Sequence, residues 1–375
     1  MCGICGLLDL SGGLGPAADV ALDRMSRSLR RRGPDDAGRW GDTEGRVRLA
    51  FRRLAILDLS PAGAQPMLSP SGRTAMVFNG EIYNFRQLRR ELGEDAASLG
   101  STGDSAVLLA AFERWGLDAL PRLDGMFAAA FWETDQRRLT LVRDRFGIKP
   151  LSLFEPGNGR LAFASRYDTL LRSPWSGGLG DRVRRDALRL FLRLGHLPAP
   201  WAVLDTTRQL EAGAWLQVEA NGTRRDGRFW RPPTATADLE RDPRRALERI
   251  EDAIESSVER QLAADVPLGV FLSGGVDSPL VAAAARAAHN RPIDAFTLGV
   301  PGWAQDESAD ARRLAGPLDL RHHLLKIEDA ALVDAVDAVR QAQHEPFADY
   351  SMVPTLLISR FARERVKVAL SGDGG

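Results

Sequence analysis

Strand-like and helix-like segments alternate through the second half of the chain, and this alternation constrains the fold more than any other feature. The predicted strands are residues 266–272, 293–300, 322–327 and 366–370, and the predicted helices are residues 243–262, 279–288, 307–314 and 353–363. Strands joined through helices pair in parallel, because each crossover returns the chain to the same end of the sheet. The second half is therefore predicted to be an α/β domain with a doubly wound parallel sheet.

The first part of the chain, to about residue 205, has short apolar runs that are separated by turn signals. Its predicted strands are residues 75–78, 126–132, 139–143 and 161–165, and its predicted helices are residues 85–92 and 104–115. The polar pair Thr134-Asp135 favours a hairpin, and Gly116 lies where a helix is expected to stop. This pattern predicts an α+β domain with stacked antiparallel sheets.

The length of 375 residues suits two domains better than one. Proline, threonine and charged residues gather between Trp230 and Pro243, which indicates a linker. The predicted organisation is a first domain over residues 2–210, a linker over 211–242 and a second domain over 243–375.

The overall charge argues against nucleic acid as a partner, because 50 basic residues are balanced by 50 acidic ones. No apolar run approaches the roughly 20 residues that cross a bilayer, and the N-terminus lacks the pattern of a signal peptide. We therefore expect a cytoplasmic protein without a membrane partner. The only cysteines, Cys2 and Cys5, lie too close in sequence to staple a large fold and give at best half of a zinc site.

Cys2 is a candidate nucleophile because Met1 is of the kind that is removed before a small residue. The thiol and the free α-amine then belong to one residue. An α-amine has a pKa of roughly 8, so it can take the proton of the thiol and leave the more nucleophilic thiolate. From position alone, the plainer interpretation of Cys2 is a small buried residue in a first strand.

Seven segments resemble the N-terminal-nucleophile glutaminase domain of asparagine synthetase and related glutamine amidotransferases. In the family's order they are residues 1–6 (MCGICG), 32–35 (RGPD), 53–58 (RLAILD), 78–84 (FNGEIYN), 101–104 (STGD), 123–127 (LDGMF) and 143–150 (RDRFGIKP). The resemblance spans the whole first domain. It implies an αββα fold of the N-terminal-nucleophile hydrolase type and hydrolysis of glutamine at Cys2.

The resemblance also implies roles for individual residues. The Asn79 side chain and the Gly80 amide would form an oxyanion hole, with two donors aimed at the charge on the amide oxygen. Arg53 would hold the carboxylate of glutamine as a bidentate fork, and Asp104 would hold its ammonium. The implied glutamine-binding set is Arg53, Leu54, Ile56, Asn79, Gly80, Glu81 and Asp104.

Several of these residues have a plainer alternative. Asn79-Gly80 is also the commonest hairpin-turn dipeptide, and Asp104 could simply cap the helix that follows it. Arg53 could be a solvated side chain. Cys5, beside Gly6, is interpreted as a packing residue.

The run 270–278 (VFLSGGVDS) ends a predicted strand and opens a predicted helix. Glycines let the backbone close around an anion, and a helix N-terminus supplies oriented N–H groups. The run lacks the lysine of a Walker loop and resembles instead the pyrophosphate loop of ATP pyrophosphatases, which form an acyl-adenylate. A bare glycine-serine turn is the plainer alternative.

Three later segments resemble the synthetase domain of the same family. They are residues 296–299 beside the adenine pocket, 345–351 near the acyl-acceptor site, and 368–375, whose Ser-Gly pair contacts ATP. Asp373 would take part in forming the adenylate, although Asp-Gly is also a common turn. The implied ATP-binding residues are Leu272, Ser273, Gly274, Gly275, Asp277, Ser278, Leu298, Ser371 and Gly372.

Two departures from the family pattern stand out. Pro279 replaces a serine, which preserves a helix start but removes one backbone donor from the phosphate cradle. The family also continues past residue 375 with an Asp-Glu pair and a helical segment that completes the active site. The second domain is therefore expected to be incomplete, as a fragment or a natural truncation.

The resemblance implies glutamine-dependent asparagine synthesis, in which ammonia made at Cys2 passes through a water-excluding channel to an aspartyl-adenylate. ATP and Mg²⁺ are implied, with Asp277 as a potential contact of the ion and without a protein-bound metal. The expected partners are glutamine, aspartate and ATP, and a homodimer stays open. The alternatives are amidation of another carboxylate, a glutaminase alone, or a non-catalytic remnant.

Overall fold

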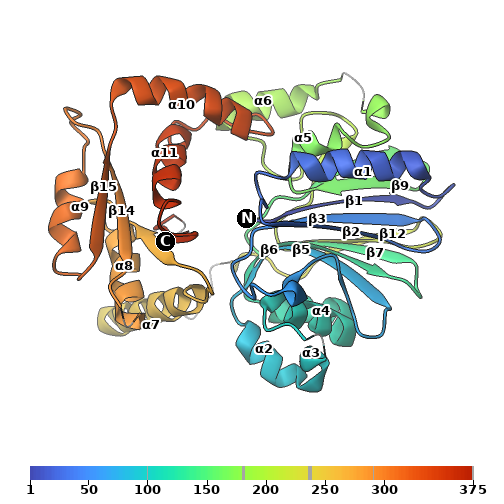
Figure 1. The fold of residues 1–375 in the computed structure, drawn as a ribbon, viewed down its shortest axis with the longest axis horizontal. Coiled ribbons are helices and arrows are strands. Elements are labelled where there is room, and N and C mark those ends of the chain that lie inside the picture. The colour runs from blue at the N-terminus through green and yellow to red at the C-terminus, as the bar shows by residue number, and fades with distance from the viewer. Residues whose placement is uncertain (99, 180–181, 235–238, 290, 374–375) are drawn as a thin grey trace. The chain divides into compact units, whose positions relative to one another are not determined.

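The computed structural model describes residues 1–98, 100–179, 182–234, 239–289 and 291–373 (Figure 1). Gly374 and Gly375 of the predicted final loop and residues 235–238 of the predicted linker lie outside this part. Two compact units are present. The first is Met1–Pro232 with His344–Ala348, and the second is Pro233–Gln343 with Asp349–Gly375.

Two six-stranded antiparallel sheets form the first unit. The first sheet has the order β10-β8-β9-β1-β3-β2 and contains β1 (Gly3–Asp9), β2 (Asp36–Gly41), β3 (Val47–Arg53), β8 (Ser152–Gly157), β9 (Arg160–Ala164) and β10 (Thr207–Gln209). The second has the order β12-β11-β7-β6-β5-β4 and contains β4 (Met67–Leu68), β5 (Thr74–Ile82), β6 (Gly125–Glu133), β7 (Arg138–Arg143), β11 (Ala214–Val218) and β12 (Arg224–Arg228).

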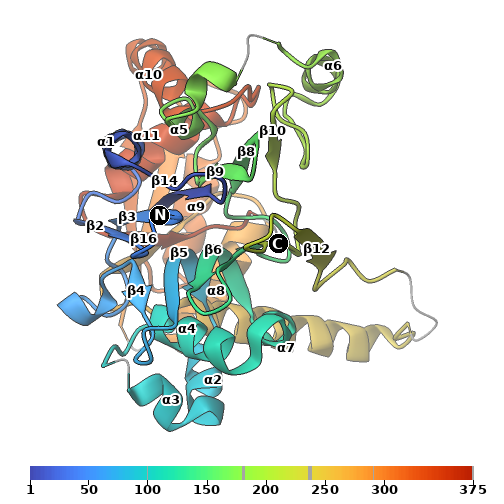
Figure 2. The same ribbon diagram turned by 90° about the vertical axis from the view of Figure 1, so that its right-hand side faces the viewer.

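Helices cover the outer faces of the two sheets. The helices of the first unit are α1 (Pro16–Ser28), α2 (Phe85–Leu92), α3 (Glu94–Ala97), α4 (Asp104–Trp115), α5 (Tyr167–Leu170) and α6 (Arg185–Leu194), with 3-10 turns at Pro61–Gly63, Gly116–Arg122 and Ser176–Gly178. Figures 1 and 2 show α1 and α5 on the side of the first sheet and α2, α3 and α4 together on the side of the second. The predicted αββα architecture is confirmed.

The largest apolar cluster lies between the two sheets and includes Ile4 of β1 and Val77 of β5, both fully buried. Successive strand residues point to opposite faces. Cys2 lies two positions before Ile4, so its side chain faces the same layer between the sheets. Cys2 packs against this cluster. By the same alternation Asn79 points into the space between the sheets.

The predicted helices 85–92 and 104–115 have the observed bounds of α2 and α4. The expectation of only two helices in this part was wrong, because α1 and α6 are also present. The hairpin interpretation of Asn79-Gly80 was also wrong, since β5 continues through both residues to Ile82 and pairs with β6 along its length. Residues 214–228, expected in a linker, form β11 and β12, and the first unit extends to Pro232.

The second unit contains a four-stranded parallel sheet with the order β15-β14-β13-β16. Its strands are β13 (Leu268–Phe271), β14 (Asp294–Gly299), β15 (Arg321–Lys326) and β16 (Val368–Leu370), and its helices are α7 (Pro243–Gln261), α8 (Asp277–Ala288), α9 (Ser308–Ala315), α10 (Asp329–Ala342) and α11 (Met352–Ala362). The predicted parallel α/β sheet is confirmed, and α10 is a helix that the sequence did not predict. Helix α8 begins at Asp277, two residues before the predicted start.

Candidate functional site

Cys2 lies at the entry of β1 and is fixed by a neighbouring loop. The Leu54 amide donates to Cys2 Sγ at 3.3 Å, and the thiol lies 3.6 Å from the Leu54 carbonyl oxygen. Arg32 Nε donates to the Cys2 carbonyl at 2.9 Å. Burial raises the pKa of the Cys2 thiol, so it needs a neighbouring base to become a thiolate.

The α-amine at the start of this chain belongs to Met1. Burial lowers its pKa to about 6, and the positive charges of Arg32 and Lys149 act in the same direction. An amine with this pKa is mostly neutral at pH 7 and can accept a proton. The environment beside Cys2 therefore suits an uncharged amine.

Asn79 is fully buried in the middle of β5, and neither its Nδ2 nor its Oδ1 has a hydrogen-bond partner among the described residues. Buried polar atoms are almost always paired, and leaving one unpaired costs about 1–3 kcal/mol. An orphaned amide that faces the same layer as Cys2 is therefore available to a ligand. Gly80 is required beside it, because a Cβ there would lie 2.2 Å from the Met126 carbonyl oxygen.

Arg53 belongs to a hydrogen-bonded network that reaches the loop before α4. Arg53 is buried and its guanidinium donates to the carbonyls of Asp58 and Ser60. The Asp58 carboxylate in turn accepts from the Ser101 hydroxyl and from the Thr102 amide at 3.0 Å. The network therefore ties the loop after β3 to the loop before α4, and the solvated interpretation of Arg53 was wrong.

Asp104 is the first residue of α4, while the cap residue is Gly103 without a side-chain cap. The Ile82 amide of β5 donates to Asp104 Oδ2 at 2.9 Å. Burial raises the pKa of Asp104 to about 7, and the nearby Glu81 acts in the same direction. A positive charge beside this carboxyl group would favour its ionised form and lower its pKa.

Two charged residues of this region were not among the predicted site residues. Arg32 bonds to the Cys2 backbone, and Lys149 is buried and interacts electrostatically with Glu81 and Cys2. Both lie in segments that resemble the family, but the residue pattern does not show which of the many cationic side chains are buried. Ile56, by contrast, is a half-buried residue of the loop after β3.

Cys5 lies on the opposite face of β1 from Cys2. It is fully buried in the cluster between α1 and the first sheet, and burial raises its pKa to about 12. Its interpretation as a packing residue is confirmed.

The loop after β13 carries the predicted pyrophosphate-loop residues in a closed turn. Ser278 Oγ accepts from the Ser273 amide at 2.8 Å, and Ser273 Oγ accepts from the Gly275 amide at 3.2 Å. A carboxylate, Glu307 Oε2, accepts from the Gly274 amide at 3.0 Å. The loop amide thus already holds an anionic oxygen, so the donor set fits a phosphate group.

The strand order reverses at β13, since β14 and β15 lie on one side of it and β16 lies on the other. Ligands of open α/β sheets bind beyond the carboxyl ends of the strands at such a switch point. The loop after β16 lies there as well, because a Cβ on Gly372 would lie 2.8 Å from the Ser278 amide nitrogen. The two predicted ATP loops are therefore side by side.

The remaining residues of the predicted ATP set lie near this point. Leu272 continues β13 and accepts from Thr297 Oγ1 at 2.7 Å, and Leu298 follows on β14. Asp373 forms a turn with Ser371, whose Oγ accepts from the Asp373 amide at 3.3 Å. Asp277 is exposed at the first position of α8, and Pro279 is the third residue of that helix, where no intrahelical N–H partner is lost.

The segment predicted near the acyl-acceptor site is divided between the units. His344–Ala348 belongs to the first unit, and Asp349 onward belongs to the second. Gln209 Nε2 donates to Glu345 Oε2 at 3.2 Å, and the Ala348 amide donates to the Gly195 carbonyl at 2.6 Å. Burial raises the pKa of Glu345 to about 6.

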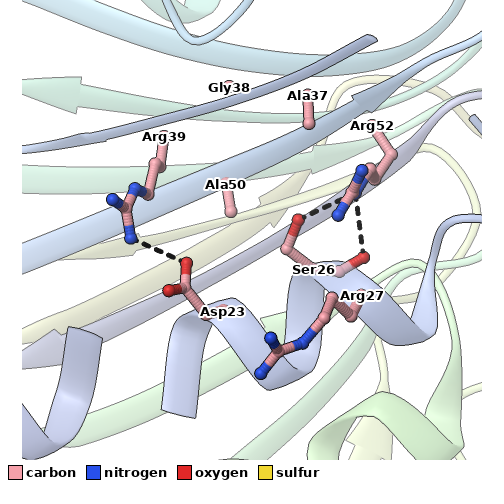
Figure 3. A pocket seen from close by; sticks show the side chains of 8 residues that line it. All are labelled: Asp23, Ser26, Arg27, Ala37, Gly38, Arg39, Ala50 and Arg52. Carbon is pink, nitrogen blue, oxygen red and sulfur yellow. Dashed lines mark hydrogen bonds and ion pairs between the residues drawn. The ribbon is translucent and has the colours of Figure 1, made fainter. Parts of the chain in front are cut away.

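A separate surface pocket of about 280 Å³ lies between α1 and strands β2 and β3 (Figure 3). Its arginines are largely engaged, since Arg39 pairs with Asp23 at 2.8 Å and Arg52 Nε donates to Ser26 Oγ at 3.1 Å. None of the predicted site residues lines it. In the described part of the chain no group of three or more His, Cys, Asp or Glu is placed to hold a metal, and no helix is long and apolar enough to cross a membrane.

Comparisons with known proteins divide the chain in the same way as the fold. Residues 1–230 match the model of the glutamine amidotransferase domain, and residues 249–375 match that of asparagine synthase. A solved structure of the glutamine phosphoribosylpyrophosphate amidotransferase of B. subtilis is similar to this chain. The similarity covers 86% of this chain and 65% of the amidotransferase chain, with 16% identity and a TM-score of 0.42.

Curated relatives match over essentially the whole chain. A provisionally named glutamine-hydrolysing asparagine synthetase of Mycobacterium tuberculosis H37Rv is 36% identical over 99% of this chain and 59% of its own length. Asparagine synthetase 1 of Bacillus subtilis is 29% identical over 100% of this chain and 58% of its own. The amidase chry2 of Gibberella zeae is 27% identical over 100% of this chain and 58% of its own length.

This chain thus spans a little under three fifths of the length of these relatives. The match to the amidotransferase model alone covers more than half of the residues of this chain. The chain belongs to the glutamine-hydrolysing asparagine synthetase family, in which a glutamine amidotransferase domain precedes an asparagine synthase domain.

Proposed function

We propose that the first unit hydrolyses glutamine with Cys2 as the nucleophile. One observation carries this proposal: the buried Asn79 amide has no hydrogen-bond partner among the residues that the structure describes, and it faces the same layer as Cys2. Its Nδ2 is a ready donor for the oxyanion of an attacked amide, and Gly80 would supply the second donor. Arg53 and Asp104 would hold the carboxylate and the ammonium of glutamine.

The chemistry uses the chain after removal of Met1. The α-amine of Cys2 takes the thiol proton, and the sulfur forms a bond to the amide carbon while the carbonyl oxygen becomes an oxyanion. The C–N bond then breaks, and ammonia leaves with the proton that the amine held. Water, activated by the same amine, hydrolyses the thioester to glutamate and restores the thiol.

The experiment compares glutamate release by the wild type, Cys2→Ala and Cys5→Ala. Cys5 is the matched control because it is the other cysteine and lies on the opposite face of β1. We expect Cys2→Ala to lose activity and Cys5→Ala to keep it. Undiminished activity in Cys2→Ala, or mass spectrometry that finds Met1 retained in active protein, would contradict the proposal.

We further propose that the second unit uses this ammonia to convert aspartate and ATP to asparagine, AMP and pyrophosphate. The two adjacent loops at the strand-order switch support this proposal, with Ser273 to Ser278 and Ser371-Gly372 as the phosphate-binding residues. ATP would bring Mg²⁺, which neutralises the phosphates. Asp277 would contact the ion, and Asp373 would assist formation of the adenylate.

Pyrophosphate release identifies the acceptor. Aspartate-dependent release of pyrophosphate, with formation of asparagine, supports the synthetase. The Cys2→Ala protein should retain this synthetase activity when ammonium salt replaces glutamine. The named amidase among the relatives makes another carboxylate the second candidate. Pyrophosphate release that depends on a different carboxylic acid supports that alternative, and glutamate production without any release supports a glutaminase alone.

A further inference from the structure

Two side chains of the second unit, Thr297 and His322, are joined by a hydrogen bond that no step above uses. Thr297 lies on β14 and is 2% exposed, and His322 lies on the neighbouring strand β15. His322 pairs with Ala295, two positions before Thr297, so the two side chains share one face of the sheet. His322 Nε2 lies 2.8 Å from Thr297 Oγ1, and Thr297 Oγ1 donates to the Leu272 carbonyl at 2.7 Å.

The direction of both hydrogen bonds follows from the groups that take part. A carbonyl oxygen only accepts, so the single hydroxyl proton of Thr297 is used on Leu272. His322 therefore donates from Nε2. Burial lowers the pKa of His322, and the positive charges of Arg312 and His323 act in the same direction. The ring is thus neutral at neutral pH and carries its one proton on Nε2.

These hydrogen bonds end on the first peptide group of the predicted pyrophosphate loop, which joins Leu272 to Ser273. Thr297 holds the carbonyl of this group, and its N–H, which belongs to Ser273, donates to Ser278 Oγ at 2.8 Å. The orientation of the peptide group is therefore fixed at both ends. Ser278 lies in the first turn of α8, whose N–H groups are candidate donors to a phosphate.

We propose that Thr297 and His322 are positioning residues for the nucleotide phosphates, which act by holding the peptide group between Leu272 and Ser273 in the orientation that the loop needs. The inference rests on the ATP site proposed above. Neither side chain has to touch the nucleotide. Donors that are ordered before the ligand arrives cost less to order on binding, so a fixed loop binds phosphate more tightly.

The test is the dissociation constant of MgATP for the full chain, measured by isothermal titration calorimetry. Thr297→Val removes the hydroxyl at nearly constant shape and should raise this constant about tenfold, because one hydrogen bond that orders the loop is lost. Thr297→Ser keeps a hydroxyl and should restore the affinity of the wild type. His322→Leu should also weaken binding, and His322→Gln, whose amide can donate in place of Nε2, should bind more tightly than His322→Leu.

His323→Leu is the matched control. His323 is the next residue of β15 and faces the other side of the sheet, where it stacks on Phe296 and bonds to Asp294 at 2.7 Å. Its loss removes a different interstrand contact and should leave the affinity for MgATP unchanged. Equal affinity in the wild type and Thr297→Val would overturn the inference. So would equal losses in His322→Leu and His323→Leu, since a general loosening of the sheet would then explain both.

Two NMR measurements do not depend on a nucleotide. The nitrogen chemical shifts of His322 should show the proton on Nε2, and the Ser273 amide should exchange with solvent faster in Thr297→Val than in the wild type or Thr297→Ser. A proton on Nδ1, or an unchanged exchange rate, would contradict the inference. A wild-type protein that does not bind MgATP would instead contradict the ATP site itself, and the exchange rates would still decide whether these two residues fix the loop.

Discussion

Asparagine at position 104 should stabilise the first unit while it removes glutamine hydrolysis. The Asp104 side chain is 6% exposed, and its burial raises the pKa from 3.8 to about 7. An amide is uncharged and resembles the protonated carboxyl group. Its oxygen can still accept from the Ile82 amide, so the substitution removes mainly the cost of burying a charge.

The sign and size of the change in the free energy of unfolding follow from proton linkage. Between pH 3.8 and about 7 the folded protein keeps a proton that the unfolded chain has released, so the stability of the wild type falls as pH rises through this window. The difference of about three pH units corresponds to about 4 kcal/mol. The free energy of unfolding of Asp104→Asn should therefore exceed that of the wild type by about 4 kcal/mol above pH 7 and by about 2 kcal/mol at pH 5.

Tryptophan fluorescence during urea unfolding is the suitable assay, because seven of the eight tryptophans precede Pro233 and report on the first unit. Asp58→Asn is the matched control. Burial tends to raise the pKa of Asp58, but hydrogen bonds from Ser101, Ser60 and Thr102 outweigh it and keep the pKa below its ordinary value. The Asp58 carboxylate stabilises the fold above pH 4. Asp58→Asn should therefore lower the free energy of unfolding by a constant amount between pH 5 and 8.

A stability difference between Asp104→Asn and the wild type that does not change from pH 5 to 8 would refute the reasoning. So would an Asp104→Asn protein that is less stable than the wild type at pH 8. Either result would mean that the Asp104 carboxylate is well solvated or paired in the folded protein.

Two further results are expected. Asn79→Ala should lower kcat for glutamine by about 10²–10³-fold, because one oxyanion donor is lost. Urea unfolding should show little loss of stability, since neither polar atom of the Asn79 side chain has a partner in the described part of the chain. Thiol titration at pH 8 should detect fast alkylation of Cys2 and none of Cys5 in the folded state, because Cys5 is fully buried with a pKa of about 12. Fast labelling of Cys5 in Cys2→Ala would contradict the packing described for β1.

The sequence predicted those elements whose signals are local. The bounds of α2 and α4 follow from apolar periodicity and from the glycines that end both helices. The strands of the parallel sheet and four of the five helices of its unit were found within one or two residues, and α10 was missed.

Other elements depend on tertiary pairing that the sequence does not display. Asn79-Gly80 is a strong turn signal, yet pairing with β6 on one side keeps β5 straight through it. Strand β12 is mostly arginine and is exposed, so it lacks any strand pattern and exists because it pairs with β11. Both cases show local propensity overridden by a sheet partner.

The candidate site also contains residues that the sequence predicts and residues whose surroundings depend on the tertiary structure. Cys2, Asn79, Arg53 and Asp104 were predicted as candidates, and the structure places each of them in the first unit with buried or constrained surroundings. Lys149 was not predicted, because the sequence does not show that its side chain is buried. The roles of all these residues remain predictions.

The start of the polypeptide lies at the layer between two sheets, and this has a practical consequence for anyone who makes the protein. An N-terminal purification tag or fusion partner would convert the α-amine into an amide and push extra chain into the space beside Cys2. For the reaction proposed at Cys2, preparations need an expression host whose aminopeptidase trims the initiator methionine efficiently.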